Sequence, residues 1–334
     1  MKKYNIPVFV PHKGCPYDCV FCNQKRITGN IKETTPRDVT ATIEEYLKTL
    51  PDKNADIEVA FFGGSFTGIP IDEQSLLMER VMPYINDGRI NGIRLSTRPD
   101  YITRTILDNL KKHHVTTIEL GVQSMVDSVL KASNRGHSSD DVIKAVKLIK
   151  EYDFSLGLQM MTGLPGDTEE YALLTAKRII ELSPQFVRIY PTLTIKDTYL
   201  EKMYENKKYV PQTLEDAVML SKDLLLMFEK AGINVIRIGL QPTDEINENA
   251  SVVAGPFHSA FGELVESAVY YDIICDAIKD MKGEVTVYVN PSEISKAVGN
   301  RRTNIRKIKE NTGIDIKISG DANLNKREVR CICF

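Results

Sequence analysis

The sequence predicts an α/β fold: a partial or complete parallel (βα) barrel of about 275 residues, followed by a small C-terminal α+β domain. From Ile6 onward, short apolar or β-branched runs alternate with longer amphipathic stretches, as in βα units. About six such units follow one another through short turns, which favours a barrel over an open sheet. The last fifty or so residues change character. The length of 334 residues suits one large domain with a small appendage.

The strands of the large domain are expected where short apolar runs are bounded by turn residues. They are Ile6–Val10, Ile57–Phe62, Gly92–Ser96, Thr116–Gly121, Ser155–Met160, Gln185–Ile189 and Val235–Ile238. Helices are expected where apolar residues recur three or four positions apart. The clearest are Arg37–Leu50, Glu73–Tyr84, Ile102–His113, Ser139–Tyr152 and Glu169–Leu182. Thr35-Pro36 is a typical helix start, and Asp140 and Asp167 are expected near two further N-caps.

The C-terminal segment is predicted to run strand, helix, turn, helix and strand. The ranges are Val285–Val289, Ser292–Val298, a Gly-Asn-Arg-Arg turn, Thr303–Thr312 and Asp315–Ser319. From Gly283 to the end there are ten Lys or Arg against six Asp or Glu, so this segment is about +4 and the rest about −6. We therefore expect two domains, 1–275 and 283–334, and an anionic partner for the second.

The N-terminus does not have the pattern of a signal peptide. Pro7 and Pro11 interrupt the apolar run after Lys2 and Lys3, and no small-residue cleavage site follows. No stretch reaches the roughly 18 apolar residues that a membrane span needs. We expect a cytoplasmic protein with reduced thiols and no membrane partner.

Three cysteines, Cys15, Cys19 and Cys22, lie in the loop after the first strand, where barrels and open sheets carry their chemistry. Thiolates select zinc, copper(I) or iron–sulfur clusters. A structural zinc would take a fourth ligand, and His12 is near enough in sequence to supply it. Three ligands on a four-iron cluster would leave one iron open for a substrate or cosubstrate. The triplet therefore predicts a metal centre, with a cluster favoured over zinc.

The spacing of the three cysteines, with Phe21 before the last, resembles the signature of the radical S-adenosylmethionine (SAM) family. The resemblance implies a [4Fe-4S] cluster whose open iron binds SAM, an electron donor such as flavodoxin or ferredoxin, and a deoxyadenosyl radical that abstracts hydrogen from the substrate. The glycine-rich segment Phe61–Gly68 also resembles the family, in which such a segment approaches the methionine end of SAM.

Later strand ends resemble further SAM-contacting segments of the family. These are Ser96–Asp100, Glu119–Ser124, Asn134–His137 and Gln159–Gly166. The resemblance implies a set of SAM-binding residues: Gly63, Gly64, Ser65, Ser96, Arg98, Glu119, Gln123, Arg135 and Gln159. Within this set, Ser65 is expected near the amino end of SAM, and Gln123, Arg135 and Gln159 near its carboxylate or ribose. For Ser96 or Arg98 taken alone, a loop cap or a surface ion pair is the favoured interpretation.

Four segments are similar to the radical SAM part of the Elongator catalytic subunit family, which modifies wobble uridine in tRNA. They are Arg188–Leu193, Asp197–Leu200, Tyr209–Pro211 and Arg237–Gln241, and the whole resemblance covers roughly residues 8 to 270. The cysteine spacing is shorter here, and no length remains for that family's acetyltransferase domain. The resemblance thus implies a relative rather than an equivalent.

The C-terminal segment Ala297–Ile305 resembles the helix, turn and helix around the GxxG loop of KH domains, which clamps single-stranded nucleic acid. Arg302 stands in place of the second glycine, and Arg306, Lys307 and Lys309 follow on the next helix, where a solvated charged face is the alternative. We expect RNA binding through residues 283–334.

Three functions remain open from the sequence. The leading one is a radical SAM enzyme acting on tRNA or rRNA. The second is a radical SAM enzyme on a small molecule or protein, similar to coproporphyrinogen oxidases, although Gln24 stands where those have a fourth cysteine. The third is a non-enzymatic RNA-binding protein with structural zinc. Cys331 and Cys333 fit a terminal strand better than an auxiliary cluster, and Cys275 fits a packed helix.

Overall fold

The fold is that of a computed structural model. It describes residues 3–10, 15, 18–23, 34–50, 55–241, 243, 246–247 and 250–333. His12 and Gln24, which bear on two of the alternatives above, lie outside the described residues.

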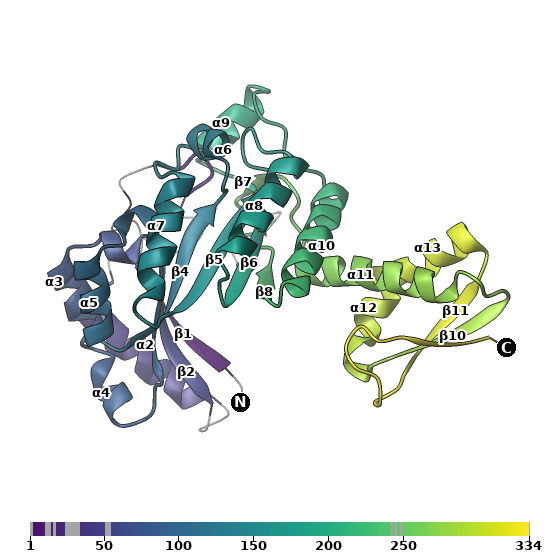
Figure 1. The fold of residues 1–334 in the computed structure, drawn as a ribbon, viewed down its shortest axis with the longest axis horizontal. Helices are drawn as coiled ribbons and strands as arrows, with labels where there is room; N and C mark the ends of the chain where they lie inside the picture. The colour runs from purple at the N-terminus through teal and green to yellow at the C-terminus, as the bar shows by residue number, and fades with distance from the viewer. Residues whose placement is uncertain are drawn as a thin grey trace.

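One parallel sheet of seven strands, in the order β1-β2-β3-β4-β5-β6-β8, forms the centre of the larger domain (Figure 1). The strands are β1 (Lys3–Val10), β2 (Asp56–Gly63), β3 (Gly92–Thr97), β4 (Val115–Gln123), β5 (Ser155–Thr162), β6 (Phe186–Pro191) and β8 (Asn234–Ile238). All neighbouring pairs are parallel. The sheet curls into a partial barrel whose edges are β1 and β8. The predicted fold class and all seven predicted strands are confirmed, and the barrel is partial rather than complete.

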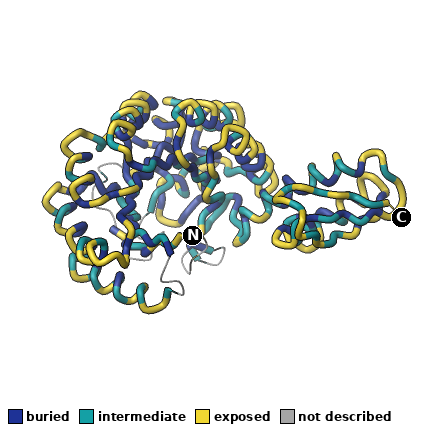
Figure 2. Tube along the Cα trace, turned by 60° about the horizontal axis from the view of Figure 1, so that its bottom comes forward, coloured by how far each residue is buried: buried dark blue, intermediate teal, exposed yellow. Residues whose placement is uncertain are grey.

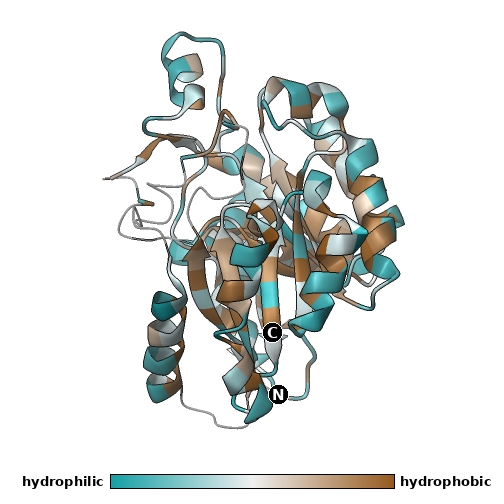
Figure 3. Ribbon diagram, turned by 90° about the vertical axis from the view of Figure 1, so that its left-hand side faces the viewer, coloured by the Kyte–Doolittle hydropathy of each residue, from teal (hydrophilic) through white to brown (hydrophobic). Residues whose placement is uncertain are grey.

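Helices cover the outer face of this sheet. They are α2 (Pro36–Thr49), α3 (Ile71–Met78), α4 (Met82–Asn86), α5 (Arg104–Lys112), α7 (Ser139–Lys150), α8 (Glu169–Glu181) and α10 (Leu214–Lys230). Figure 3 shows the polar faces of these helices turned outward. Two further helices, α6 (Asp127–Ala132) and α9 (Tyr199–Glu205), lie at the carboxyl ends of the strands, next to the cysteine loop. The single helix expected over Glu73–Tyr84 is wrong, because two helices, α3 and α4, occupy this range. Pro83 near the start of α4 has no N–H to continue the helical hydrogen bonds.

The two N-caps expected near Asp140 and Asp167 are present. The side chain of Ser138 caps α7, and Asp141 completes its capping box. Thr168 caps α8 by accepting a hydrogen bond from the Tyr171 backbone. Hydroxyl side chains at these positions satisfy the first free N–H groups of each helix.

Strand alternation separates an apolar face from a polar face. On β4, Ile118, Leu120 and Val122 are fully buried in the main core under the helices. Glu119 and Gln123 alternate with them and therefore point to the inside of the barrel. Figure 2 shows the buried residues concentrated between strands and helices. The inner face is consequently where polar chemistry is located.

A smaller sheet forms the C-terminal unit, in the order β11-β10-β12. It contains β10 (Glu284–Val289), α12 (Ile294–Val298), α13 (Thr303–Thr312), β11 (Asp315–Gly320) and β12 (Arg330–Cys333). β10 is parallel to β11 and antiparallel to β12. The predicted order of elements is confirmed, and Cys331 and Cys333 lie on the terminal strand. The assignment to the KH fold stays a prediction.

Helix α11 (Phe261–Ile278) joins the two parts of the molecule (Figure 1). Its first half packs against α10, with Phe261 and Val265 in a shared cluster. Its second half supplies Tyr270 and Ile274 to the core of the C-terminal unit, and Cys275 packs there as expected. The proposed boundary between residues 275 and 283 stays a prediction.

Two short strands, β7 (Thr194–Ile195) and β9 (Val252–Ala254), pair in a separate antiparallel ladder after the barrel strands. In the part of the chain that the structure describes, no helix is both long and apolar enough for a membrane crossing.

Candidate cofactor site at the carboxyl ends of the strands

The cysteine loop after β1 is fixed from two sides by backbone hydrogen bonds. Val20 N–H donates to the carbonyl of Ser133 over 3.1 Å, and Leu200 N–H donates to the carbonyl of Val20 over 2.7 Å. The Asn134 side chain donates to the carbonyl of Asp18 over 3.0 Å. The loop is therefore held between the α6–α7 turn and the start of α9.

Apolar packing supports the same arrangement. Val20 and Phe21, which separate the last two cysteines, pack against Leu200, Met203 and Tyr209. These partners lie nearly two hundred residues along the chain, on α9 and the segment after it. The aromatic residue of the cysteine signature thus has a structural reason, because it anchors the loop on α9.

The three thiols lie close enough to influence one another electrostatically. Burial raises the pKa of Cys22 to about 12, and the neighbouring Cys19 and Cys15 raise it further. Burial also raises the pKa of Cys15, which Arg135 partly offsets. Buried thiols favour the neutral form until a cationic centre binds them as thiolates. Among the described residues, no three His, Cys, Asp or Glu side chains come close enough together to hold one metal ion.

Arg135 connects the cysteine loop to β4. One terminal nitrogen donates to the Cys19 sulfur at 3.4 Å, and the other donates to the carbonyl of Gly121 at 2.8 Å. A Cβ on Gly121 would lie 2.7 Å from this guanidinium and 3.0 Å from the Gln123 amide. Residue 121 therefore has to be glycine for Arg135 and Gln123 to keep these positions.

The ends of β2 and β3 are joined by a small hydroxyl cluster. The Oγ of Ser65 and the Oγ1 of Thr97 lie 2.9 Å apart, and the hydroxyls of Thr67 and Thr97 lie 2.6 Å apart. Ser65 Oγ also accepts the backbone N–H of Arg98 at 3.1 Å. The Gly64 backbone N–H donates to the carbonyl of Val10. Thr97 lies within the segment Ser96–Asp100 but was not singled out there, since a strand-end threonine carries no distinctive spacing.

Gly63 has φ +109°, and a Cβ there would lie 3.2 Å from the carbonyl oxygen of Val10. Both the backbone conformation and the contact with β1 explain glycine at this position. A side chain at residue 63 would therefore be disfavoured even without a bound cofactor.

Arg98 forms a bidentate ion pair with Asp100, with both hydrogen bonds at 2.9 Å. The Arg98 side chain is only 2% exposed. The ion pair expected for Arg98 is therefore present, but its guanidinium is buried and not on the surface. Ser96, on β3 just before Arg98, has a buried hydroxyl with no hydrogen-bond partner among the described residues.

His137 was also not singled out from the sequence. It is buried, with Nε2 3.2 Å from the carbonyl oxygen of Val122. Burial and the neighbouring Arg135 lower its pKa to about 4, which keeps the ring neutral near pH 7. It lies beside Arg135, inside the turn that holds the cysteine loop.

The inner-facing polar atoms fit a bound polar cofactor. Gln123 Oε1 and Arg135 Nε are buried, and neither has a hydrogen-bond partner among the residues that the structure describes. Leaving such atoms unpaired costs about 1–3 kcal/mol each, and a polar ligand would satisfy them. Three soft thiol donors beside this surface are the donor set that iron–sulfur clusters use.

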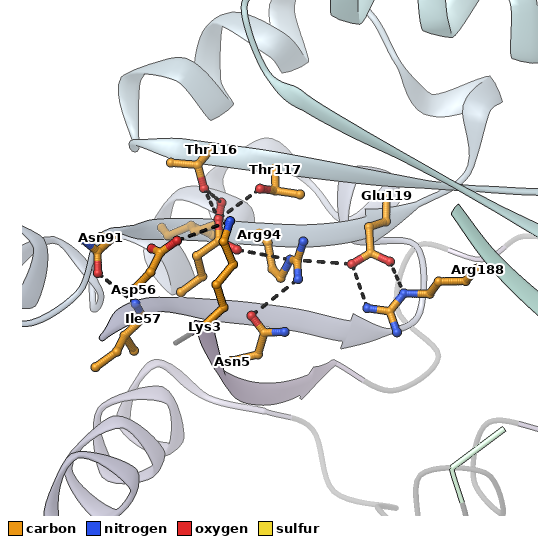
Figure 4. Close-up of polar contacts among 12 residues, drawn as sticks. Lys3, Asn5, Asp56, Ile57, Asn91, Arg94, Thr116, Thr117, Glu119 and Arg188 are labelled. Carbon is orange, nitrogen blue, oxygen red and sulfur yellow. Dashed lines mark hydrogen bonds and ion pairs between the residues drawn. The ribbon is translucent and has the colours of Figure 1, made fainter. Parts of the chain in front are cut away.

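Glu119 and Gln159 belong to the predicted SAM-binding residues, but they lie on the barrel wall and not beside the cysteine loop. Figure 4 shows Glu119 between Arg94 and Arg188. Arg188 Nε and a terminal nitrogen lie 2.6 and 3.2 Å from its two oxygens, and Gln159 Nε2 lies 3.5 Å away. The carboxylate of Glu119 is fully buried, and its oxygens are engaged by arginines of the barrel wall.

Comparison with known proteins gives the following similarities. A family model for the radical SAM superfamily matches residues 9–179, and one for the radical SAM C-terminal domain matches residues 184–271. The tRNA uridine(34) acetyltransferase of Methanocaldococcus infernus is 27% identical over 252 residues, covering 64% of this chain and 47% of that protein. Elongator complex protein 3 of Saccharomyces cerevisiae is 29% identical over 186 residues, covering 49% and 33%.

Among solved structures, the archaeal Elp3 of Methanocaldococcus infernus has the same fold, with a TM-score of 0.65 at 24% identity. The matched region covers 81% of this chain and 63% of the Elp3 chain. The chain spans about half the length of the tRNA uridine(34) acetyltransferase that it matches.

Proposed function

Because the chain belongs to the radical SAM superfamily, we propose that it is an RNA-modifying enzyme of that superfamily acting on tRNA or rRNA. Members of the superfamily are enzymes that use a [4Fe-4S] cluster and SAM, and this protein is one of them. The non-enzymatic alternative with structural zinc is therefore wrong. In the proposal, Cys15, Cys19 and Cys22 ligate the cluster.

When bound and reduced by a donor such as flavodoxin or ferredoxin, the cluster and SAM supply a deoxyadenosyl radical. The residues of this chain prepare the site. Arg135 places a positive charge beside the Cys19 sulfur and donates a hydrogen bond to it. Gln123 and Ser96 have buried polar atoms that no described residue pairs, and these atoms suit SAM as a partner. Gly63 and Gly121 keep side chains out of crowded positions around it.

The observation that carries the RNA assignment is the turn between α12 and α13. Arg301 and Arg302 are both exposed and both in the left-handed region, with φ of 49° and 62°. A non-glycine residue there costs about 1–2 kcal/mol, so two consecutive arginines are an unfavourable choice for folding alone. Their side chains are well suited to phosphate, and the similar tRNA uridine(34) acetyltransferase and its relatives support RNA as the substrate.

The enzymatic part is tested by anaerobic purification followed by iron and sulfide analysis. We expect a brown protein that forms deoxyadenosine from SAM after reduction, and a Cys19→Ala variant that forms none. Cys275→Ala, which lies in the distant core under the C-terminal sheet, is the matched control and should retain activity. A colourless wild-type protein that keeps one zinc per chain would contradict the proposed ligand set.

The substrate is tested by mass spectrometry of tRNA and rRNA nucleosides from a deletion strain. We expect one modified nucleoside to disappear and to return with the wild-type gene but not with Cys19→Ala. Unchanged nucleosides together with an altered small-molecule pool would replace RNA by the second alternative, a small-molecule substrate.

A further inference from the structure

The inner wall of the barrel carries more positive charge than its own carboxylates neutralise. Arg94 on β3 and Arg188 on β6 lie against two carboxylates, Glu58 and Glu119, whereas Arg237 on β8 makes no ion pair with any of the described residues. None of these residues belongs to the cysteine loop or to its immediate neighbours. The wall is therefore a second polar region, deeper in the barrel than the cysteines.

Arg94 and Arg188 are held in place by the two carboxylates. Arg94 Nε lies 3.4 Å from Glu58 and 3.6 Å from Glu119, and Arg188 grips Glu119 through two nitrogens. This bidentate contact with Glu119 fixes the guanidinium of Arg188 in one orientation (Figure 4). Its remaining terminal nitrogen lies 3.4 Å from the hydroxyl of Tyr190, which is a weak contact.

Arg237 differs from these two arginines. It is the register partner of Arg188 on the neighbouring strand, so the two side chains leave the sheet on the same face. It is half-buried, and it has no hydrogen bond or ion pair to any residue within the described ranges. A half-buried cation without a partner is costly and gains from an anionic ligand.

The position of Arg237 also suits a large ligand. β8 is an edge strand of the partial barrel, so its inner face borders the side on which no further strand of this sheet follows. Two guanidiniums on adjacent strands can each donate to a phosphate oxygen, and the phenol of Tyr190 adds a third donor beside Arg188.

We propose that Arg237, the outward nitrogen of Arg188 and the hydroxyl of Tyr190 form an anion-binding subsite for a backbone phosphate of the RNA substrate. This inference rests on the proposed function and extends it, because it fixes where the strand carrying the target nucleotide is held relative to the barrel. Glu119 is a positioning residue in this subsite, since it acts by orienting Arg188.

The test measures binding of fluorescently labelled tRNA to the full-length, cluster-loaded protein as a function of salt concentration. Arg237→Gln should weaken binding about fivefold to tenfold and reduce the slope of log affinity against log salt by about one. Arg237→Lys should recover part of the affinity, because it keeps the charge but not the planar fork. Arg80→Gln, an exposed arginine on the opposite, helix-covered face, is the matched control and should bind like wild type.

A second measurement separates failure of the subsite from failure of the RNA proposal. Inorganic phosphate should raise the melting temperature of the wild type and not that of Arg237→Gln. Stabilisation by phosphate without any tRNA binding would keep the anion subsite and reject RNA as its ligand. Equal tRNA affinity and equal phosphate stabilisation for wild type and Arg237→Gln would overturn the subsite.

Discussion

The cysteine site and the α12–α13 turn use opposite physical means to prepare for a ligand. Around the cysteines, polar atoms are buried, and a single added methyl group at Gly121 would collide with two of the residues that face the site. At the turn, Arg301 and Arg302 are exposed, and their backbone conformation rather than their packing is unusual. The first region is selective through shape, and the second attracts through charge.

This difference predicts how each region responds to mutation and salt. A crowded, buried site loses function through small changes in volume and is little affected by ionic strength. The exposed arginine side chains of the turn tolerate changes in volume, but ligand binding through their charge depends strongly on salt.

Gly121→Ala should weaken SAM binding about a hundredfold, or about 2.7 kcal/mol. The new Cβ would displace Arg135 and Gln123, the two residues it would approach within 3.0 Å. The measurement is SAM titration of the reconstituted protein by calorimetry. Gly88→Ala, whose Cβ would meet nothing within 4 Å, should bind SAM normally. Normal affinity in Gly121→Ala would show that the cofactor site is less crowded than the comparison requires.

Gly299→Ala should destabilise the C-terminal unit by about 2 kcal/mol, because residue 299 combines a positive φ with close contacts. Its Cβ would lie 2.9 Å from the backbone nitrogen of Asn304 and 3.0 Å from the hydroxyl of Ser267. Urea unfolding followed by tyrosine fluorescence measures the effect. Gly313→Ala has a similar φ but open space around it, so it should cost only about 1 kcal/mol. Equal losses of unfolding free energy in both variants would show that the backbone conformation alone, and not the close contacts of residue 299, causes the destabilisation.

Asp167→Asn should stabilise the protein above pH 6 by about 1.5 kcal/mol, a value discounted for partial exposure. Burial raises the pKa of Asp167 to about 6. The folded protein therefore binds more protons than the unfolded chain between about pH 4 and 6, and stability falls as pH rises through that window. Asparagine keeps an acceptor for the Gly163 N–H. Thermal unfolding at pH 4 and pH 8 checks this, and a difference of the same size at both pH values would contradict it.

Arg302→Gly should raise the free energy of unfolding by about 1 kcal/mol, because glycine adopts φ 62° without strain. The same change should reduce the salt slope of tRNA binding by about one. Arg306→Ala, on the exposed face of α13, should change the slope without raising stability. If Arg302→Gly leaves the slope unchanged, the turn does not contact phosphate and the contrast between the two regions fails.

Much of the architecture followed from local patterns. Apolar alternation located all seven barrel strands, and the helical spacing located the main helices, because these patterns act within one element. The two helices in place of Glu73–Tyr84 show the limit of that approach, since Pro83 interrupts a pattern that otherwise reads as continuous. The candidate site followed in part. The sequence indicated Arg135 and Gln123 by resemblance. Thr97, His137 and Leu200 lie in segments that resemble the family, but nothing in the sequence distinguished them from their neighbours.

The sequence by itself determined the order of the βα units and the three thiol donors. The tertiary structure decided which side chains meet. Arg135 reaches Cys19 across 116 positions of the chain, and Arg188 reaches Glu119 across 69. Such pairs depend on strand register and on the curl of the sheet, which brings distant residues to one inner face. Local periodicity contains no information about that register, so the charge of the barrel wall became visible only in the folded protein.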